Sequence, residues 1–212
     1  MNLFKEIKRE AKSFFKNARG SHDWDHTERV YNLCMRIGEK EKVDLQVLKF
    51  AAILHDIGRE EEYNSKGKVC HAERSAELAR DILAKYGFDE EKIDKITHCI
   101  ETHRFRGNKI PKTKEAKVLF DADKLDSIGA VGIGRTFLFA GEVGARLHNK
   151  DVNIEKTEPY TIEDTGYREF MFTLRKIKDR MLTEEGKIIA EERHKFMADF
   201  FDRLNKEVDG IL

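Results

Sequence analysis

The sequence is poor in cysteine and proline, carries no net charge and contains no long apolar run, and each absence excludes a class of protein. Three cysteines without a Cys-x-x-Cys pair predict neither a disulfide framework nor a thiolate zinc site. Because 40 Lys and Arg balance 40 Asp and Glu, the overall charge does not attract nucleic acid. No stretch approaches ~18 apolar residues and the N-terminus lacks an apolar signal core, so we predict a cytoplasmic protein with neither membrane nor nucleic acid as partner.

Helical periodicity is what the sequence has in abundance. Apolar residues recur at three- and four-residue spacing, as in Val30, Leu33 and Ile37, and no alternating run is long enough for a strand. Asp44 and Asp89 directly precede such segments and are predicted to cap helices. We therefore predict an all-α fold. The expected helices span residues 3–17, 22–40, 45–57, 70–86, 90–103, 114–126, 128–140, 167–181 and 184–207.

The length of the chain favours a single domain over residues 1–212. We expect core helices in 1–140, then an irregular segment over 141–166 that is long enough to be a candidate lid. A helical hairpin over 167–212 follows, which could pack within the chain or across a homodimer. The shorter segment 59–69 holds glycine, asparagine and charges without an apolar face, and it is also predicted to be irregular.

Eight histidines are the most informative residues, because some of them lie on apolar helix faces. His26 shares the face of its predicted helix with Val30 and should point inward at the edge of the core. His55 shares a face with Leu48, and Asp56 follows it directly. The side chains of neighbouring residues point ~100° apart around a helix axis, but both can still bind one ion that lies beyond the helix end.

A second carboxylate, Asp123, lies on an apolar face with Leu119 in a third predicted helix. Burying a lone carboxylate is costly, so a carboxylate at such a position needs a cation. Two imidazoles and two carboxylates from three helices would form a mixed nitrogen and oxygen site. Such a set suits one divalent ion, namely Mn, Fe, Co, Ni or Mg, with positions left for water and a substrate oxygen.

The order His…His-Asp…Asp resembles the HD-domain metal-dependent phosphohydrolases, in a branch similar to nucleotide hydrolases. Three segments carry the resemblance: HDWDHTERV (22–30), FAAILHDIGR (50–59) and LFDADKLDSIGAVGIGR (119–135). It implies an HD-domain helical bundle and an enzyme that cleaves phosphate ester or phosphoanhydride bonds of a small phosphorylated substrate, a nucleotide. It implies these metal ligands: His26, His55, Asp56 and Asp123.

Cations near these segments are candidates for binding phosphate. A lysine contacts phosphate at the matching place in some HD phosphodiesterases. Here Arg59 follows the His-Asp pair by three residues, and its guanidinium group could bind a phosphate bidentately. Arg104 and Lys124 are further candidates. A water-activating base would help the reaction, and for this catalytic role we predict Asp56 of the metal site or Asp126.

His71 and His103 lie on apolar faces and should also point inward, where they could contact substrate. The resemblance permits them to bind a second metal, although the tandem His-His motif of binuclear HD proteins is absent. Two alternatives to the single-metal phosphohydrolase therefore remain. One is a binuclear phosphodiesterase or oxygenase, and the other is a non-catalytic HD module that binds a nucleotide for regulation.

Three glycines, Gly129, Gly132 and Gly134, superficially suggest a nucleotide-binding loop. No strand is predicted before them, so the turn of a dinucleotide-binding fold is not supported. Close packing between helices explains these glycines better.

Overall fold

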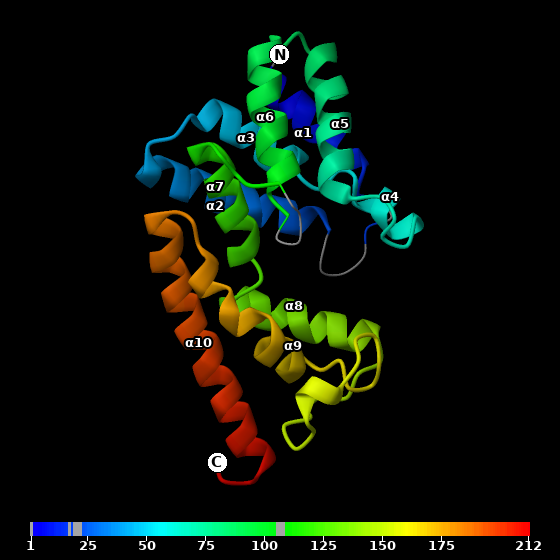
Figure 1. Ribbon diagram of the computed structural model, residues 1–212, viewed down its shortest axis with the longest axis vertical. Helices are drawn as coiled ribbons and strands as arrows, with labels where there is room; N and C mark the ends of the chain where they lie inside the picture. The colour runs from blue at the N-terminus through cyan, green and yellow to red at the C-terminus, as the bar shows by residue number, and fades with distance from the viewer. Residues whose placement is uncertain (1, 17, 19–22, 105–108) are drawn as a thin grey trace. The chain divides into compact units, whose positions relative to one another are not determined.

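The computed structural model describes residues 2–16, 18, 23–104 and 109–212, and these residues form helices and loops without a single strand (Figure 1). The predicted all-α class is confirmed. Contacts group the chain into two compact units, residues 1–123 and 124–212. The prediction of one domain with divisions at 140 and 166 stays a prediction.

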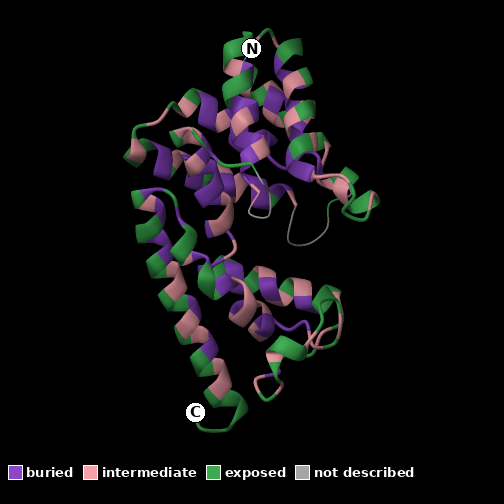
Figure 2. Cartoon of the chain, viewed as in Figure 1, coloured by how far each residue is buried: buried purple, intermediate pink, exposed green. Residues whose placement is uncertain are grey.

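The first unit is built around one central helix, α3 (Leu45–Leu54), which has an apolar surface on nearly every side. A helix of this composition must be covered by its neighbours, and α3 contacts α1, α2, α5 and α6. Figure 2 shows buried segments concentrated where the helices of this unit face one another. The other helices that lie in or begin in this unit are α1 (Leu3–Ser13), α2 (Trp24–Glu41), α4 (Arg59–Asn64), α5 (His71–Lys85), α6 (Glu90–Thr102) and α7 (Lys114–Leu125).

Aspartates begin several helices of this unit, because their carboxylates accept hydrogen bonds from the exposed N–H groups of the first turn. The predicted caps are confirmed: Asp44 accepts from Val47 N at 3.2 Å, and Asp89 accepts from Lys92 N at 2.9 Å. Helix α2 begins one residue after its cap, Asp23. Residue 22, where we predicted that helix to begin, and residue 17, where the first helix was predicted to end, lie outside the described residues.

Four of the predicted segments differ in the structure. The helix expected over 3–17 ends at Ser13. The helix expected over 45–57 ends at Leu54, which leaves His55 and Asp56 at the helix end. Part of the segment expected to be irregular, 59–69, forms α4 instead. Three glutamates in its first turn favour a helix, since they complement the positive end of the helix dipole. The helix expected over 167–181 is short and gives way to 3₁₀ turns.

The second unit contains α8 (Gly129–Glu142), α9 (Gly166–Phe172) and α10 (Glu184–Val208), with α8 contacting both of the others. Its core gathers around Phe201 of α10. The ring of Phe170 stacks on it with centroids 4.6 Å apart, and the ring of Phe137 lies at 6.3 Å. Three 3₁₀ turns complete the unit: Ile154–Lys156, Leu174–Lys176 and Lys178–Arg180.

The segment between α8 and α9 is irregular, as predicted, but buried hydrogen bonds hold it. Arg168 Nη1 donates to Asp164 Oδ1 at 2.8 Å, and Thr165 Oγ1 donates to Asn149 Oδ1 at 2.5 Å. Asn149 Nδ2 in turn donates to the carbonyl of Glu163 at 2.9 Å. This network satisfies the buried polar groups of a segment that has no apolar face. Its role as a lid stays a prediction.

The glycines of α8 differ in their surroundings. A Cβ at Gly132 would lie 2.2 Å from the carbonyl oxygen of Ser127 and 3.0 Å from Met197 Cε of α10, so close packing against a second helix contributes to this glycine, as expected. At Gly134 a Cβ would meet nothing within 4 Å, so the packing explanation is wrong there. Gly129 has a φ of +76°, which disfavours any side chain at that position.

We expect Gly132→Ala to lower the free energy of unfolding by about 1–3 kcal/mol or more, because the new methyl group would displace backbone. Gly134→Ala is the matched control in the same helix. It should be neutral or should stabilise the protein by up to about 1 kcal/mol, since alanine is the better helix former. Urea unfolding measures both, and equal effects of the two substitutions would contradict the packing described for Gly132.

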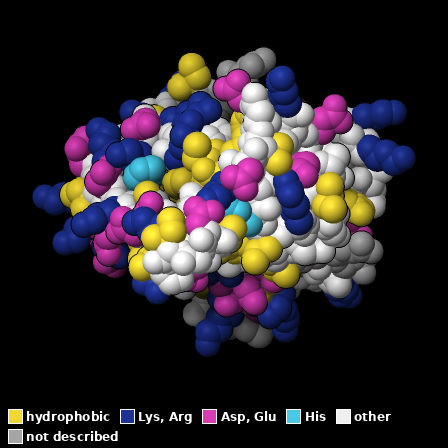
Figure 3. All heavy atoms as spheres, turned by 90° about the horizontal axis from the view of Figure 1, so that it is seen from below, with side chains coloured by type: hydrophobic (Ala, Val, Ile, Leu, Met, Phe, Trp, Pro, Cys, Tyr) yellow, Lys and Arg dark blue, Asp and Glu magenta, His cyan; other side chains and the backbone are white. Residues whose placement is uncertain are grey.

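The surface carries charges of both signs. Figure 3 shows acidic and basic side chains interspersed on one face of the molecule, in keeping with the zero net charge. Among the described residues, no helix combines the length and the apolar character that crossing a bilayer requires.

Candidate metal centre

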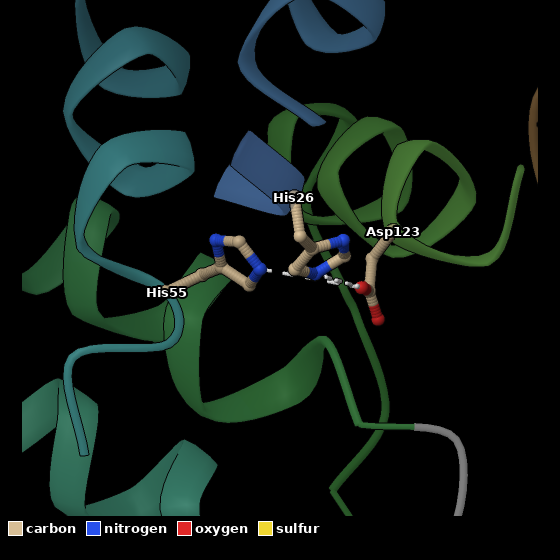
Figure 4. A group of neighbouring side chains, drawn as sticks. All are labelled: His26, His55 and Asp123. Atoms are coloured by element: carbon tan, nitrogen blue, oxygen red, sulfur yellow. Dashed lines mark ion pairs between the residues drawn. The ribbon is translucent and has the colours of Figure 1, made fainter. Parts of the chain in front are cut away.

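Three helix ends of the first unit deliver the predicted ligands. His26 lies in the first turn of α2, where its N–H donates to the cap Asp23 at 3.0 Å. His55 is the C-terminal cap of α3, and Asp56 begins the turn that follows. Asp123 lies in the last turn of α7. Figure 4 shows His26, His55 and Asp123 pointing toward one another from separate segments.

The four side chains meet closely. His26 Nε2 lies 3.3 Å from Asp123 Oδ1 and 3.7 Å from Asp56 Oδ2. His55 Nε2 lies 3.7 Å from Asp56 Oδ2 and 4.0 Å from Asp123 Oδ1. Both histidines and Asp56 are buried, and the side chain of Asp123 is 13% exposed. The predicted residues therefore converge, with one member of the set open to solvent.

The hydrogen bonds of His55 define which of its nitrogens faces the cluster. Its Nδ1 lies 2.8 Å from the carbonyl oxygen of Ala52, which can only accept, so Nδ1 carries the proton of the neutral ring. Nε2 then presents a lone pair to the cluster and has no hydrogen-bond partner, and neither has Asp56 Oδ1. Burial lowers the pKa of His55 to about 4, against the opposing charge of Asp56, so the ring is neutral at pH 7.

Asp56 is charged in spite of its burial. Desolvation acts to raise the pKa of this carboxyl group, but the adjacent charge of Arg59 opposes it, and the pKa lies well below its ordinary value. Arg59 Nε donates to Asp56 Oδ2 at 2.9 Å. A charged carboxylate and the lone pair of His55 thus share a buried space, and acceptor groups in such a space are stabilised by a cation.

His71 and His103 point inward, as predicted, and approach the other oxygen of Asp56. Asp56 Oδ1 lies 3.6 Å from His71 Nε2 and 3.5 Å from His103 Nε2. The two Nε2 atoms are 3.3 Å apart. Both rings are buried, and His103 Nδ1 lies 2.5 Å from the carbonyl oxygen of Ile100. Asp56 therefore stands between the His26–His55 pair and the His71–His103 pair.

The two arginines predicted to bind phosphate both contact a residue that the sequence analysis missed, Glu62 of α4. Arg59 Nη1 lies 3.5 Å from Glu62 Oε2, and Arg104 Nη1 lies 3.1 Å from Glu62 Oε1. The side chains of Arg59 and Arg104 are 27% and 31% exposed. Glu62 was missed because 59–69 was predicted to be irregular. Its spacing of three from Arg59 is the signal that could have indicated a helical ion pair.

The remaining predicted residues lie in the second unit. Lys124 is in the last turn of α7. Asp126 is buried, and its Oδ2 accepts from Arg135 Nη1 at 2.7 Å. The same guanidinium nitrogen donates to the carbonyl of Asp126 at 3.2 Å. A carboxylate held in this way is a weak base, because protonation would break a charge-assisted hydrogen bond.

Among the described residues of the first unit, two groups of candidate ligands have donor atoms that lie within 4.8 Å of one another. One consists of His26, His55 and Asp123, and the other of His55, Asp56 and His103. Imidazole nitrogens combined with carboxylate oxygens suit first-row divalent ions. The residues therefore fit a divalent metal, as the sequence predicted.

Comparison with known proteins places the chain in a family. The model of the HD domain matches residues 23–128. YpgQ of Bacillus subtilis, named as an uncharacterized protein, is 36% identical over 211 residues that cover 97% of this chain and 94% of YpgQ. The chain belongs to the HD domain family.

Solved structures agree with this assignment. YpgQ in complex with ADP aligns with a TM-score of 0.74 at 31% identity, covering 97% of this chain and 94% of that one. An HD-superfamily hydrolase from Bacillus thuringiensis aligns with a TM-score of 0.76 at 26% identity, covering 97% and 96%. The fold and family of this chain are thus those of the HD-superfamily hydrolases.

Proposed function

We propose that the protein is a metal-dependent phosphohydrolase that cleaves a phosphate ester or phosphoanhydride bond of a small substrate, a nucleotide. The observation that carries the proposal is a buried cluster of acceptors. The lone pair of His55 Nε2 and the charged Asp56 Oδ1 have no hydrogen-bond partner, and they lie beside His26 and Asp123. A divalent cation bound by these four residues would offset the cost of that arrangement.

One divalent ion per chain is the expected cofactor, from the group Mn, Fe, Co, Ni and Mg. When bound, such an ion lowers the pKa of a water ligand and offsets charge on a phosphoryl oxygen. His55 is preorganised for this role, since the carbonyl of Ala52 fixes its ring with Nε2 toward the cluster. Asp123 is the partly exposed member of the four proposed ligands, so a substrate would approach the metal from the side of Asp123.

Arg59 and Arg104 would bind the phosphate of the substrate. Both side chains are partly exposed and both form ion pairs with Glu62, so a phosphate could compete with Glu62 for their positive charge. Contact of His71, His103 and Lys124 with the substrate, and assistance from Asp126 as a base, remain parts of the proposal. The hydrogen bonds from Arg135 argue for Asp56 over Asp126 as the carboxylate that interacts with water.

A nucleotide is the favoured substrate class because YpgQ, which this chain resembles along nearly its whole length, has been crystallised with ADP. A cytoplasmic location and a homodimer remain predictions from the sequence.

The test is a hydrolysis screen of the purified protein with each of the five metals in turn. The substrates are phosphomonoesters, nucleoside triphosphates and phosphodiesters, and Asp56→Asn is the control. Turnover of a nucleotide by the wild type alone would support the proposal. Binding of a nucleotide without turnover, with every metal, would favour the regulatory module.

A binuclear phosphodiesterase or oxygenase is the second candidate, favoured by the approach of His71 and His103 to Asp56 Oδ1. We expect one ion per chain when the protein is saturated with manganese and its metal content is measured by mass spectrometry. Of the two ligand groups found among the described residues, the one that contains Asp123 reaches solvent, whereas the members of the other are all buried. A ratio of two that falls to one in His103→Asn would contradict this and favour the binuclear enzyme.

A further inference from the structure

Glu62 lies at the centre of a chain of contacts that no predicted role explains. Its Oε2 is 2.8 Å from His71 Nδ1 and 3.5 Å from Arg59 Nη1, and its Oε1 is 3.1 Å from Arg104 Nη1. The side chain is only 16% exposed. Burial acts to raise the pKa of Glu62, but the hydrogen bond from His71 and the charges of the two arginines lower it below its ordinary value. Glu62 is therefore a carboxylate at neutral pH.

The contact with Glu62 determines the tautomer of His71. A carboxylate can only accept hydrogen bonds, so the proton of the neutral His71 ring must lie on Nδ1. The lone pair of the ring is then on Nε2, which faces Asp56 Oδ1 at 3.6 Å and His103 Nε2 at 3.3 Å. His103 has the same tautomer, because its Nδ1 contacts the carbonyl of Ile100.

The consequence is a buried point at which acceptor atoms face one another. Two imidazole lone pairs and one carboxylate oxygen lie within hydrogen-bond range of any protic group placed between them. If the proton of His71 moved to Nε2, this ring would become a donor and would hydrogen-bond Asp56 or His103 instead. The arrangement thus depends on the partner of Nδ1, which is Glu62.

We propose that Glu62 is a positioning residue, which holds His71 with its proton on Nδ1 so that Nε2 accepts a hydrogen bond from a protic group at the reaction site. This rests on the proposed hydrolase function, in which the protic group is water or a hydroxyl of the substrate. Arg59 and Arg104 assist by fixing the Glu62 carboxylate. A carboxylate that orients the histidine of a site in this manner affects turnover by about 10- to 100-fold in related arrangements.

The test compares Glu62→Gln with Glu61→Gln. Glutamine at 62 can donate its amide N–H to His71 Nδ1 and so permits the other tautomer. Glu61 is the matched control, since it lies on the same short helix, is exposed and pairs with Arg74 at 2.7 Å. Glu62→Asp keeps an acceptor-only group and should preserve the wild-type tautomer.

Two readouts are needed. Nitrogen-15 spectra of the histidine rings in metal-free protein at pH 7.5 report the tautomer of His71, which is assigned by its loss in His71→Asn. We expect an Nδ1 proton in the wild type, in Glu61→Gln and in Glu62→Asp, and a shift toward Nε2 in Glu62→Gln. In the metal-loaded protein, kcat of Glu62→Gln should fall by about 10- to 100-fold with KM changed less than about twofold.

Each outcome is decisive. A wild-type His71 protonated on Nε2, or a tautomer unchanged in Glu62→Gln, would overturn the positioning role whatever the activity. A shifted tautomer with unchanged kcat would overturn its importance for the reaction. Failure of the wild type to hydrolyse any phosphorylated substrate would refute the proposed function, and the spectra would still decide whether Glu62 sets the tautomer.

Discussion

Replacing Asp56 with asparagine should abolish turnover and lower metal affinity by at least about 100-fold, the largest effect that we expect of any single substitution. Asp56 is a charged carboxylate that faces both His55 and the His71–His103 pair. An amide oxygen is a much weaker metal ligand than a carboxylate, and it contributes no charge. The loss should therefore appear in metal binding and in kcat together.

The same substitution should leave the fold intact. The asparagine oxygen can still accept from Arg59, which donates to Asp56 Oδ2 at 2.9 Å in the wild type. Its amide N–H can donate to the lone pairs of His71 and His103, which face Oδ1. We therefore expect the metal-free variant to fold but to melt below the wild type, because the buried ion pair between Asp56 and Arg59 is lost.

Thermal unfolding with and without metal tests both the loss of metal binding and the retention of the fold. A metal at a hundredfold excess over its Kd stabilises the wild type by about 2.7 kcal/mol, and this gain should vanish in Asp56→Asn. Asp81→Asn makes the same chemical change at an exposed position of α5 and should behave as wild type. A variant at position 56 that retains metal-induced stabilisation and turnover would refute the proposed metal centre.

Acidification should destabilise the metal-free protein between pH 6.5 and about 4. Burial lowers the pKa of His55 from 6.5 to about 4, so the unfolded chain binds a proton in this range that the folded protein does not. Stability from this group is thus fully present above pH 6.5, declines as the pH falls, and is lost near pH 4. The decline amounts to ~3 kcal/mol for His55 alone.

His71 acts in the same direction, because burial lowers its pKa as well in spite of the hydrogen bond with Glu62. The free energy of unfolding should be measured by urea denaturation in the presence of a chelator at several pH values. His55→Asn removes one of the titrating rings and should flatten the slope between pH 6.5 and 4. An equal slope in the variant and the wild type would show that His55 titrates normally.

The dependence on metal and the sensitivity to acid share one cause. The site of this protein gathers lone pairs and negative charge from several segments into the interior of the first unit. Protons and metal ions compete for the same lone pairs, so acid should weaken metal binding as well as the fold. A neutral pH, at which His55 is neutral and Asp56 is charged, is the condition under which the site is ready for a cation.

Much of the site could be predicted from the sequence because helical periodicity reports burial. His26, His55 and Asp123 each lie on an apolar face, and a polar group there must find a partner inside the protein. The resemblance to the HD family then indicated that these groups share one ion. The predicted caps Asp44 and Asp89 also follow from local chemistry alone, since a carboxylate before an apolar helical segment satisfies its first N–H groups.

Glu62 could not be found in this manner. Its helix, α4, has no apolar face and is only six residues long, so periodicity gives no signal. Its partners His71 and Arg104 lie 9 and 42 residues away in sequence, and only packing brings the three together. Asp126 illustrates the reverse case. It was predicted to be a candidate base, whereas in the structure its carboxylate accepts a hydrogen bond from Arg135.

The amino-acid sequence by itself determined the helical class, the caps and the inward direction of the candidate ligands, since each depends on neighbours within a few positions of one helix. Tertiary structure alone decided how the acceptors are distributed around Asp56, which tautomer His71 adopts and which arginines reach Glu62. These properties depend on distances of 3–4 Å between atoms of different helices. Such distances are fixed only when the apolar faces pack, and packing is a property of the whole unit.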